Sequence, residues 1–217
     1  MTAKLFEQPR YIAIEGPIRV GKSSLAQHLA KTLHARHIVE PENNPFLDRF
    51  YGAEAGMAFA SQMWFLAERY EQLRTVKNSD EPVVADYIFE KDKLFAYVNL
   101  SDAELALYNR YYQTFREQLP APDLVIYLQA TPEVLKQRLK RKGVAGERAI
   151  SDAYIEQIAA AYEHFFFHYS ASDLLIVNTS DIDFVKNNKD LKLLMKRLSE
   201  PIKGTQYFLP LGENAAD

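Results

Sequence analysis

The sequence predicts an α/β fold in which a five-stranded parallel sheet is flanked by helices. Short apolar runs rich in Ile, Val and Tyr alternate with stretches of helical spacing, and a glycine-bearing turn follows the first run. Strands that alternate with helices favour a parallel sheet with right-handed crossovers and with both faces covered. The predicted strands are Tyr11–Ile14, Arg36–Val39, Pro82–Ala85, Leu124–Leu128 and Leu174–Val177.

Helical patterns fill the intervals between these strands. Leu25, Leu29 and Leu33 recur at helical spacing after the first strand, and Thr131-Pro132 is typical of an N-cap followed by proline at the first helical position. The sequence contains no internal repeat and no linker long enough to divide it. We therefore expect residues 1–217 to form one domain, with an irregular tail over about residues 201–217.

Composition excludes several classes of protein. Lys and Arg number 26 against 29 Asp and Glu, so a net charge of −3 gives no basic surface for nucleic acid or for an anionic membrane. The absence of cysteine excludes disulfides and thiolate metal sites and fits a reducing compartment. No apolar run approaches the roughly 20 residues that span a bilayer. We expect a cytoplasmic protein.

The most specific motif follows the first strand. It satisfies the pattern G-x-x-x-x-G-K-[ST] between a strand and a helix, which is the context that a phosphate-binding P-loop requires. Glycines let backbone N–H groups converge on phosphate oxygens, and the helix N-terminus favours an anion. The lysine of the motif can neutralise the β- and γ-phosphates of ATP, and its serine can ligate Mg²⁺. The predicted nucleotide-binding residues are Gly16, Pro17, Ile18, Arg19, Val20, Gly21, Lys22, Ser23 and Ser24.

Further features favour a small-molecule kinase over other P-loop proteins. The sequence lacks the N-K-x-D run with which GTPases usually read guanine. A cluster of cations ends the helix after the fourth strand, where it can swing onto triphosphate oxygens as a lid over about residues 138–149. Arg138 and Arg141 are the predicted catalytic cations of this lid.

A carboxylate follows the second strand in Val39-Glu40-Pro41. The carboxyl ends of parallel strands border the crevice in which such sheets bind ligands. Glu40 can therefore take the proton of an attacking hydroxyl, as a general base does. Glu42, two residues later, is the competing candidate.

Several spaced residues extend this pattern. Tyr51, Gln62 and Arg69 follow at intervals of 11 and 7 residues, and Asp86 closes the third strand six residues before Asp92. Together with the P-loop and Glu40, they make the sequence similar to the deoxynucleoside kinases, in particular the bacterial deoxyadenosine/deoxyguanosine kinase branch. The resemblance extends from residue 11 to about residue 198.

The resemblance implies roles on the acceptor side of the site. Glu40 would be the base for the 5′-hydroxyl, and Tyr51 would bind the sugar 3′-hydroxyl. Gln62 would hydrogen-bond the base edge, with Arg69 beside it. An ion pair between Asp92 and Arg69 would fix this base-reading surface.

The resemblance also implies roles around the triphosphate. Asp86 would hold Mg²⁺ together with Ser23, and the loop with Asp183-Phe184 would cup the adenine. Glu147 in the lid falls close to a family glutamate that binds the sugar 3′-hydroxyl. The sequence departs from the family at Tyr87, where an arginine is usual, and Arg148 could substitute for it.

The predicted function is ATP-dependent 5′-phosphorylation of a deoxyribonucleoside in nucleotide salvage. The alternatives are a nucleoside monophosphate kinase of the thymidylate kinase kind and a catalytically weak nucleotide-binding protein. Acidic residues around Glu40, Glu42 and Asp48 disfavour an anionic acceptor. The resemblance also implies a homodimer through helices near Phe59–Leu73 and Ala103–Phe115.

Overall fold

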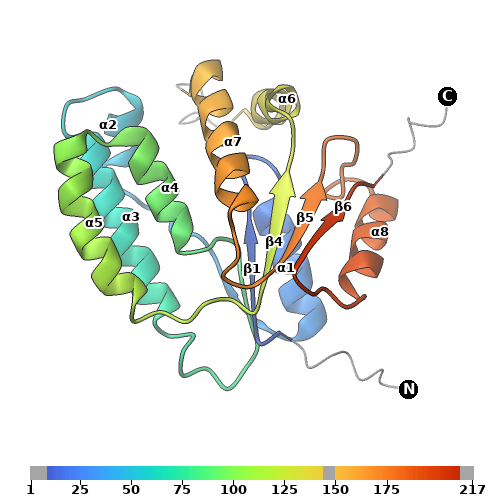
Figure 1. Ribbon diagram of the computed structural model, residues 1–217. Helices are drawn as coiled ribbons and strands as arrows, with labels where there is room; N and C mark the ends of the chain where they lie inside the picture. Colours follow the sequence, from blue (N-terminus) through green and yellow to red (C-terminus); the bar gives the residue numbers. More distant parts are fainter. Residues whose placement is uncertain (1–8, 144–149, 211–217) are drawn as a thin grey trace.

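The computed structural model describes residues 9–143 and 150–210, which build a parallel sheet with the strand order β2-β3-β1-β4-β5-β6 (Figure 1). The strands are β1 (Tyr11–Glu15), β2 (Arg36–Ile38), β3 (Val83–Ala85), β4 (Leu124–Gln129), β5 (Asp173–Asn178) and β6 (Thr205–Phe208). The helices are α1 (Lys22–Leu33), α2 (Leu47–Tyr51), α3 (Met57–Leu73), α4 (Glu90–Asn99), α5 (Asp102–Arg116), α6 (Pro132–Lys142), α7 (Asp152–Phe167) and α8 (Asn188–Leu198).

The two faces of the sheet bury alternate residues of each strand. In β1, Tyr11 and Ala13 belong to a core with helices α3, α4, α5 and α7, whereas Ile12 and Ile14 belong to a core with α1 and α8. Successive side chains of a strand point to opposite faces, so a strand that is covered on both sides must be apolar throughout. This requirement explains why the central strands are continuous apolar runs.

The sixth strand corrects the prediction of five strands and of an irregular tail over about residues 201–217. β6 pairs in parallel with β5, with Leu174 opposite Thr205 and Val177 opposite Phe208. Gly204 adopts φ +63° and donates its N–H to Asp173, and the strand begins at the next residue. β6 is an edge strand with Tyr207 exposed, and it therefore lacks a continuous apolar run.

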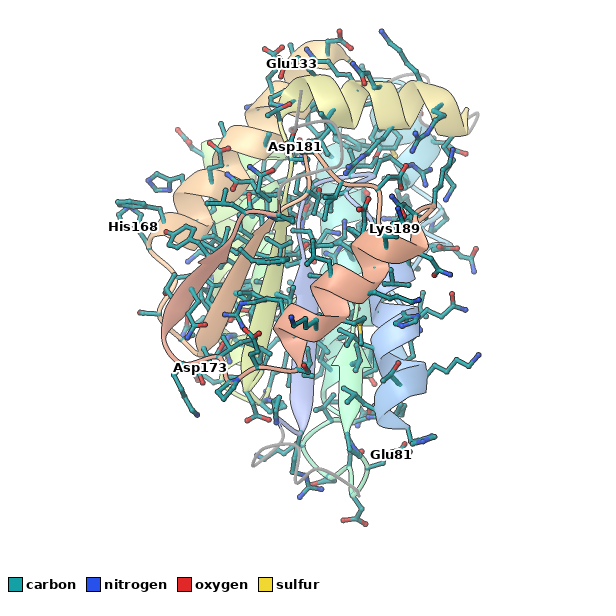
Figure 2. All side chains as sticks on the ribbon, turned by 90° about the vertical axis from the view of Figure 1, so that its right-hand side faces the viewer. Glu81, Glu133, His168, Asp173, Asp181 and Lys189 are labelled. Carbon is teal, nitrogen blue, oxygen red and sulfur yellow. The ribbon has the colours of Figure 1, made fainter. Side chains whose placement is uncertain are left out.

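The five predicted strands are all present, with ends that differ by one residue at most. Figure 2 shows Asp181, which follows β5, at the opposite end of the sheet from Glu81 and Asp173, which lie before β3 and at the start of β5. The loops that carry the predicted site residues therefore share the carboxyl end of the sheet. Within the described residues, no helix combines the length and the apolar character needed to cross a membrane.

Candidate active site

The loop between β1 and α1 has the backbone geometry of a phosphate-binding loop. Gly16 and Gly21 have φ values of +148° and +110°, which favour glycine. A Cβ at Gly16 would lie 2.3 Å from the carbonyl oxygen of Leu128, and one at Gly21 would lie 2.6 Å from Cζ of Phe184. The two motif glycines are therefore required by close packing as well as by backbone conformation.

Lys22 begins α1 and folds back over this loop. Its Nζ donates to the carbonyl oxygens of Gly16 at 2.8 Å and of Pro17 at 3.1 Å. Burial and the neighbouring ammonium group of Lys91 lower the pKa of Lys22 to about 8. An incoming phosphate would compensate for both effects, so the lysine is placed for an anionic ligand.

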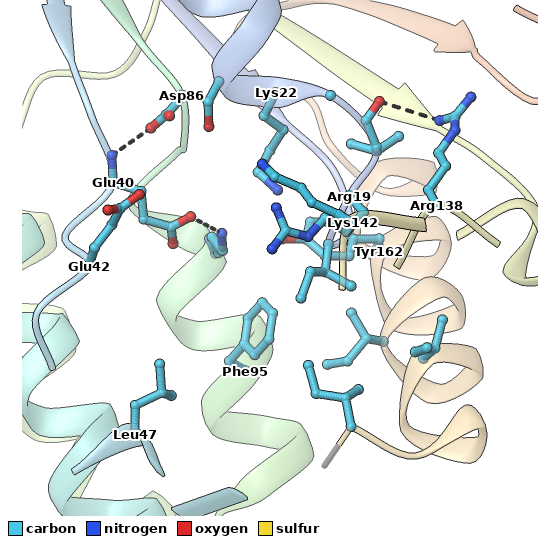
Figure 3. Close-up of a pocket in the computed structure, with 18 of the residues that line it drawn as sticks. Arg19, Lys22, Glu40, Glu42, Leu47, Asp86, Phe95, Arg138, Lys142 and Tyr162 are labelled. Carbon is cyan, nitrogen blue, oxygen red and sulfur yellow. Dashed lines mark hydrogen bonds and ion pairs between the residues drawn. The ribbon is translucent and has the colours of Figure 1, made fainter. Parts of the chain in front are cut away.

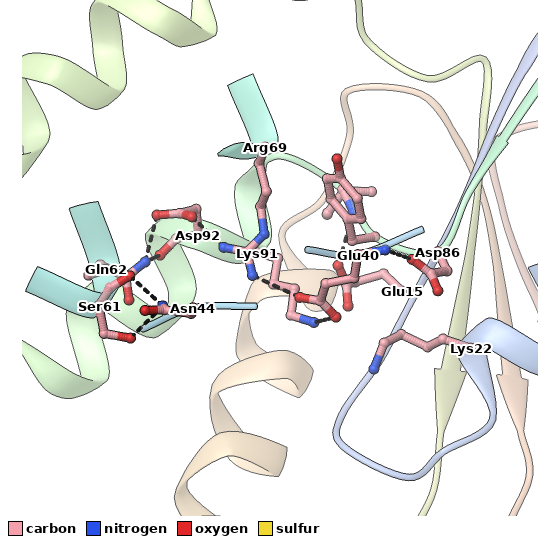
Figure 4. A network of polar contacts seen from close by, with 12 residues as sticks. Glu15, Lys22, Glu40, Asn44, Ser61, Gln62, Arg69, Asp86, Lys91 and Asp92 are labelled. Carbon is pink, nitrogen blue, oxygen red and sulfur yellow. Dashed lines mark hydrogen bonds and ion pairs between the residues drawn. The ribbon is translucent and has the colours of Figure 1, made fainter. Parts of the chain in front are cut away.

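Glu40 lies between two cations at the end of β2. Its Oε1 accepts from Arg69 at 2.7 Å, and its Oε2 accepts from Lys91 at 2.7 Å (Figure 4). Burial alone would raise the pKa of Glu40, but Lys91, Arg69 and Lys22 together hold that pKa well below its ordinary value. Glu40 is therefore a carboxylate, and 25% of its side chain is exposed.

A buried polar cluster lies behind Glu40. Asp92 on α4 is fully buried and accepts from Arg69, from Tyr108 at 2.9 Å and from Gln62 Nε2 at 2.5 Å. Although burial lowers the pKa of Arg69, Asp92 and Glu40 raise it above its ordinary value. The cluster therefore keeps a charged guanidinium in a fixed orientation, as the predicted pairing of Arg69 with Asp92 requires.

Asp86 connects the end of β3 to the second strand. Its Oδ1 accepts the backbone N–H of Glu40 at 2.6 Å, and thereby fixes the start of the loop that carries the carboxylate. In the part of the chain that the structure describes, no donor reaches the buried Oδ2 of Asp86. A buried carboxylate oxygen without a donor fits a cation as its missing partner.

The two predicted lid arginines contact the loop after β5. Arg138 donates to the carbonyl oxygens of Thr179 at 2.6 Å and of Ile182 at 3.0 Å, and Arg141 forms an ion pair of 3.1 Å with Asp183. Phe184 of the same loop is buried beside Gly21. The arginines on α6 thus hold the loop that was predicted to cup the adenine.

One cavity of about 910 Å³ joins most of these groups (Figure 3). Its lining contains the P-loop from Ile18 onward, the carboxylates after β2 and β3, one face of helix α3 and both lid arginines. Of the predicted site residues, these line the cavity: Ile18, Arg19, Val20, Gly21, Lys22, Ser23, Ser24, Glu40, Tyr51, Gln62, Arg69, Asp86, Arg138, Arg141, Asp183 and Phe184.

Three predicted residues, Gly16, Pro17 and Asp92, are described by the structure but do not line the cavity. Gly16 and Pro17 contact Lys22 but are not part of the cavity lining. Asp92 is also not part of the lining, because it lies behind Gln62 and Arg69 and positions them. Glu147, together with Arg148, lies outside the described residues.

The structure adds a cation that sequence reasoning missed. Lys91 lines the cavity and contacts Glu40, whereas Lys93, two residues later, lies over the rings of Tyr97 and Tyr112. Both lysines flank Asp92 in the sequence, and no local pattern separates them. The two lysines lie on different faces of helix α4, and only the face with Lys91 is directed toward the cavity.

The chain matches a family model described as deoxynucleoside kinase over residues 12–203. It is 34% identical over 201 residues to a deoxyguanosine kinase from Bacillus subtilis, covering 88% of this chain and 97% of that protein. It is 27% identical to a deoxyadenosine/deoxycytidine kinase from the same organism, covering 90% of this chain and 94% of that protein. Among solved structures, a deoxyadenosine kinase from M. mycoides with bound dATP has 26% identity and a TM-score of 0.76, covering 87% of this chain and 98% of that chain.

These matches and the geometry agree on the reaction. The relatives are kinases of deoxynucleosides, and the chain supplies a P-loop with Lys22 and a carboxylate, Glu40, in one cavity. The reaction is ATP-dependent phosphorylation of a deoxynucleoside. The relatives therefore do not favour the two alternative functions, a nucleoside monophosphate kinase and a catalytically weak nucleotide-binding protein. The chain belongs to the deoxynucleoside kinase family.

Proposed function

We propose that the protein transfers the γ-phosphoryl group of ATP to the 5′-hydroxyl of a purine deoxynucleoside. The observation that carries this proposal is that Glu40 and the P-loop with Lys22 line the same cavity. A hydroxyl between them would have a base on one side and the phosphoryl group on the other. Phosphoryl transfer depends mainly on such positioning and on electrostatic stabilisation.

The residues divide into a donor side and an acceptor side. On the donor side, the P-loop N–H groups and Lys22 bind the phosphates, and the loop with Asp183 and Phe184 binds the adenine. On the acceptor side, Glu40 removes the proton of the 5′-hydroxyl. The acceptor-side groups that contact the deoxynucleoside are Tyr51, Gln62, Arg69 and Glu147.

The base-reading surface supports an acceptor with a polar edge. Gln62 uses its Nε2 for Asp92, through the carbonyl oxygen at 2.8 Å and the carboxylate, which leaves its Oε1 to accept from a base. Arg69 lies over the ring of Phe65 at 4.6 Å, and both residues line the cavity. The similarity to a deoxyguanosine kinase supports a purine, with deoxyguanosine as the first candidate.

Magnesium is the metal that the donor side would hold. Mg²⁺ prefers oxygen ligands and usually binds through one or two carboxylates plus substrate phosphates. The buried Oδ2 of Asp86 and the hydroxyl of Ser23 are ligands of this kind, and both residues line the cavity. When bound with ATP, the ion would neutralise charge on the β- and γ-phosphates.

A substrate panel tests the function, the acceptor and the metal together. We expect phosphorylation of deoxyguanosine and deoxyadenosine with ATP and Mg²⁺, with kcat/KM at least about tenfold above that for pyrimidine deoxynucleosides, and loss of turnover after chelation by EDTA. One tenfold step corresponds to about 1.4 kcal/mol of transition-state discrimination. Equal turnover of thymidine would contradict the purine assignment, and turnover only of deoxynucleoside monophosphates would contradict the acceptor class.

We further propose a homodimer in the cytoplasm, with α3 and α5 at the interface. Two large apolar side chains one turn apart on α5, Leu107 and Tyr111, are 41% and 49% exposed. Their burial against a second copy would remove them from water. Sedimentation should therefore give twice the mass of one chain, and Leu107→Asp should shift it toward the monomer. A monomeric wild-type protein would contradict this proposal.

A further inference from the structure

Lys91 of α4 is a buried cation in the lining of the cavity, at a place where the sequence predicts none. Its side chain is only 7% exposed, and its Nζ lies 2.7 Å from Glu40 Oε2 and 5.7 Å from the ring centre of Phe95. Figure 4 shows Lys91 reaching Glu40 from α4, with Lys22 on the P-loop side. A buried ammonium group is costly unless its charge is used or balanced.

Three other cations of the cavity lining, Arg69, Arg138 and Arg141, already have partners. Arg69 is held by the buried carboxylate of Asp92 as well as by Glu40. Arg138 and Arg141 of α6 contact the loop after β5. Lys91, by contrast, has Glu40 as its ion-pair partner among the residues that the structure describes. Glu40 is therefore the carboxylate that balances the ammonium group of Lys91.

Tyr87 cannot supply the charge that an arginine would bring to its position. Its side chain is fully buried, and its hydroxyl donates to Gln72 Oε1 at 2.5 Å, so it is committed to α3. The phenol is also neutral. The additional cation for the transferring group must come from another residue.

The reaction itself changes the electrostatic balance at Lys91. The O–H bond of the 5′-hydroxyl breaks and its proton passes to the Glu40 carboxylate. The hydroxyl oxygen forms a bond to the γ-phosphorus, and the bond to the β-phosphate oxygen breaks with its electron pair left on ADP. Glu40 thus becomes neutral while the oxygens around the phosphorus carry the negative charge.

We propose that Lys91 is a catalytic residue that turns from the Glu40 carboxylate to the transferring phosphoryl group and takes the place of the arginine absent at Tyr87. The hydroxyl must lie between Glu40 and the γ-phosphorus, so an ammonium group bound to Glu40 is beside the reacting atoms. An interaction that strengthens as charge moves accelerates the chemical step, whereas one that is constant only strengthens binding. The inference rests on the proposed function.

Lys91→Met tests this role, because methionine keeps the length and apolar stem of lysine without its charge. We expect kcat to fall about 10²- to 10³-fold, the range for loss of one donor at a developing charge. The KM for the deoxynucleoside and the affinity for ATP should both change much less, because Lys91 is paired with Glu40 before the reaction begins. Lys91→Arg should recover at least about tenfold of the lost kcat, since its guanidinium restores a donor cation.

Lys93→Met is the matched control, since it removes an ammonium group from the same helix but outside the cavity. Its kcat should stay close to that of the wild type. The inference is overturned if Lys91→Met retains kcat within about fivefold of the wild type, or if the loss appears as weaker ATP binding with kcat unchanged. If Lys91→Met does not fold, as thermal unfolding would show, Lys91→Gln is judged by the same criteria.

The two proposals fail in different ways. If the wild type phosphorylates deoxynucleosides and Lys91→Met does so equally well, the role of Lys91 alone is wrong. If the wild type phosphorylates none, the proposed function is wrong. The catalytic role of Lys91, which rests on that function, is then wrong as well.

Discussion

Replacing Glu40 with glutamine is expected to lower kcat about 10²- to 10⁴-fold, the usual contribution of a general base. Glutamine keeps the shape of the side chain but cannot take the proton of the 5′-hydroxyl. It also removes the carboxylate that holds Arg69 and Lys91 at 2.7 Å each. Steady-state kinetics with the preferred deoxynucleoside and saturating ATP would measure the change.

The loss should appear in the chemical step rather than in nucleotide binding. Lys22 and the P-loop remain intact in Glu40→Gln, so the affinity for ATP should change little. Arg69 keeps its contact with Asp92, so the base-reading surface also remains. A large loss of kcat with nearly unchanged ATP affinity would therefore assign the role of base to Glu40.

Glu42→Gln is the control for this experiment. Glu42 lines the same cavity, is exposed and lies two residues from Glu40, which makes it the competing candidate from the sequence. Its replacement should leave kcat within about threefold of the wild-type value, as expected for an exposed carboxylate outside the proton path. If Glu42→Gln lost activity and Glu40→Gln did not, the base assignment would be reversed.

The parts of the fold that the sequence predicts are those with a local signal. β1, β4 and β5 are covered on both faces and must be apolar along their whole length, so their runs are visible without a structure. β6 is only four residues long and lies at the sheet edge, where Tyr207 is exposed. Its residues alternate between exposed and half-buried, so no continuous apolar run marks it.

The same distinction applies to the site. Glu40 could be predicted because it directly follows a strand, whose carboxyl end fixes its position. Lys91 could not be predicted because Lys93 is equivalent to it in the sequence, and only the orientation of α4 directs one of them toward the cavity. The contact of Arg138 with Thr179 joins residues 41 positions apart, and spacing alone cannot foresee it.

Replacing Asp92 with asparagine is expected to lower the free energy of unfolding by about 3–5 kcal/mol, the cost of removing one partner from a buried ion pair. Asp92 is fully buried and accepts from Arg69, Gln62 and Tyr108. The side-chain amide of asparagine has only one acceptor oxygen, and its NH₂ group would face at least one of these three donors. That donor would then lose its hydrogen bond. Arg69 would keep Glu40 as its ion-pair partner, but at the edge of the cavity, where the carboxylate is also needed for the reaction.

Urea unfolding of Asp92→Asn, Arg69→Met and the double variant would measure this effect as a double-mutant cycle. The buried guanidinium of Arg69 destabilises the folded state mainly when Asp92 no longer balances its charge. The double variant should therefore lose less stability than the sum of the two single losses. A coupling of about 0.5–3 kcal/mol is typical of residues in one buried network.

Glu54→Gln, which breaks the exposed ion pair with Arg49, is the control and should leave the unfolding midpoint unchanged. If Asp92→Asn were no more destabilising than this control, Asp92 would not be the anchor of the base-reading surface. Gln62 and Arg69 would then have to be positioned by α3 alone.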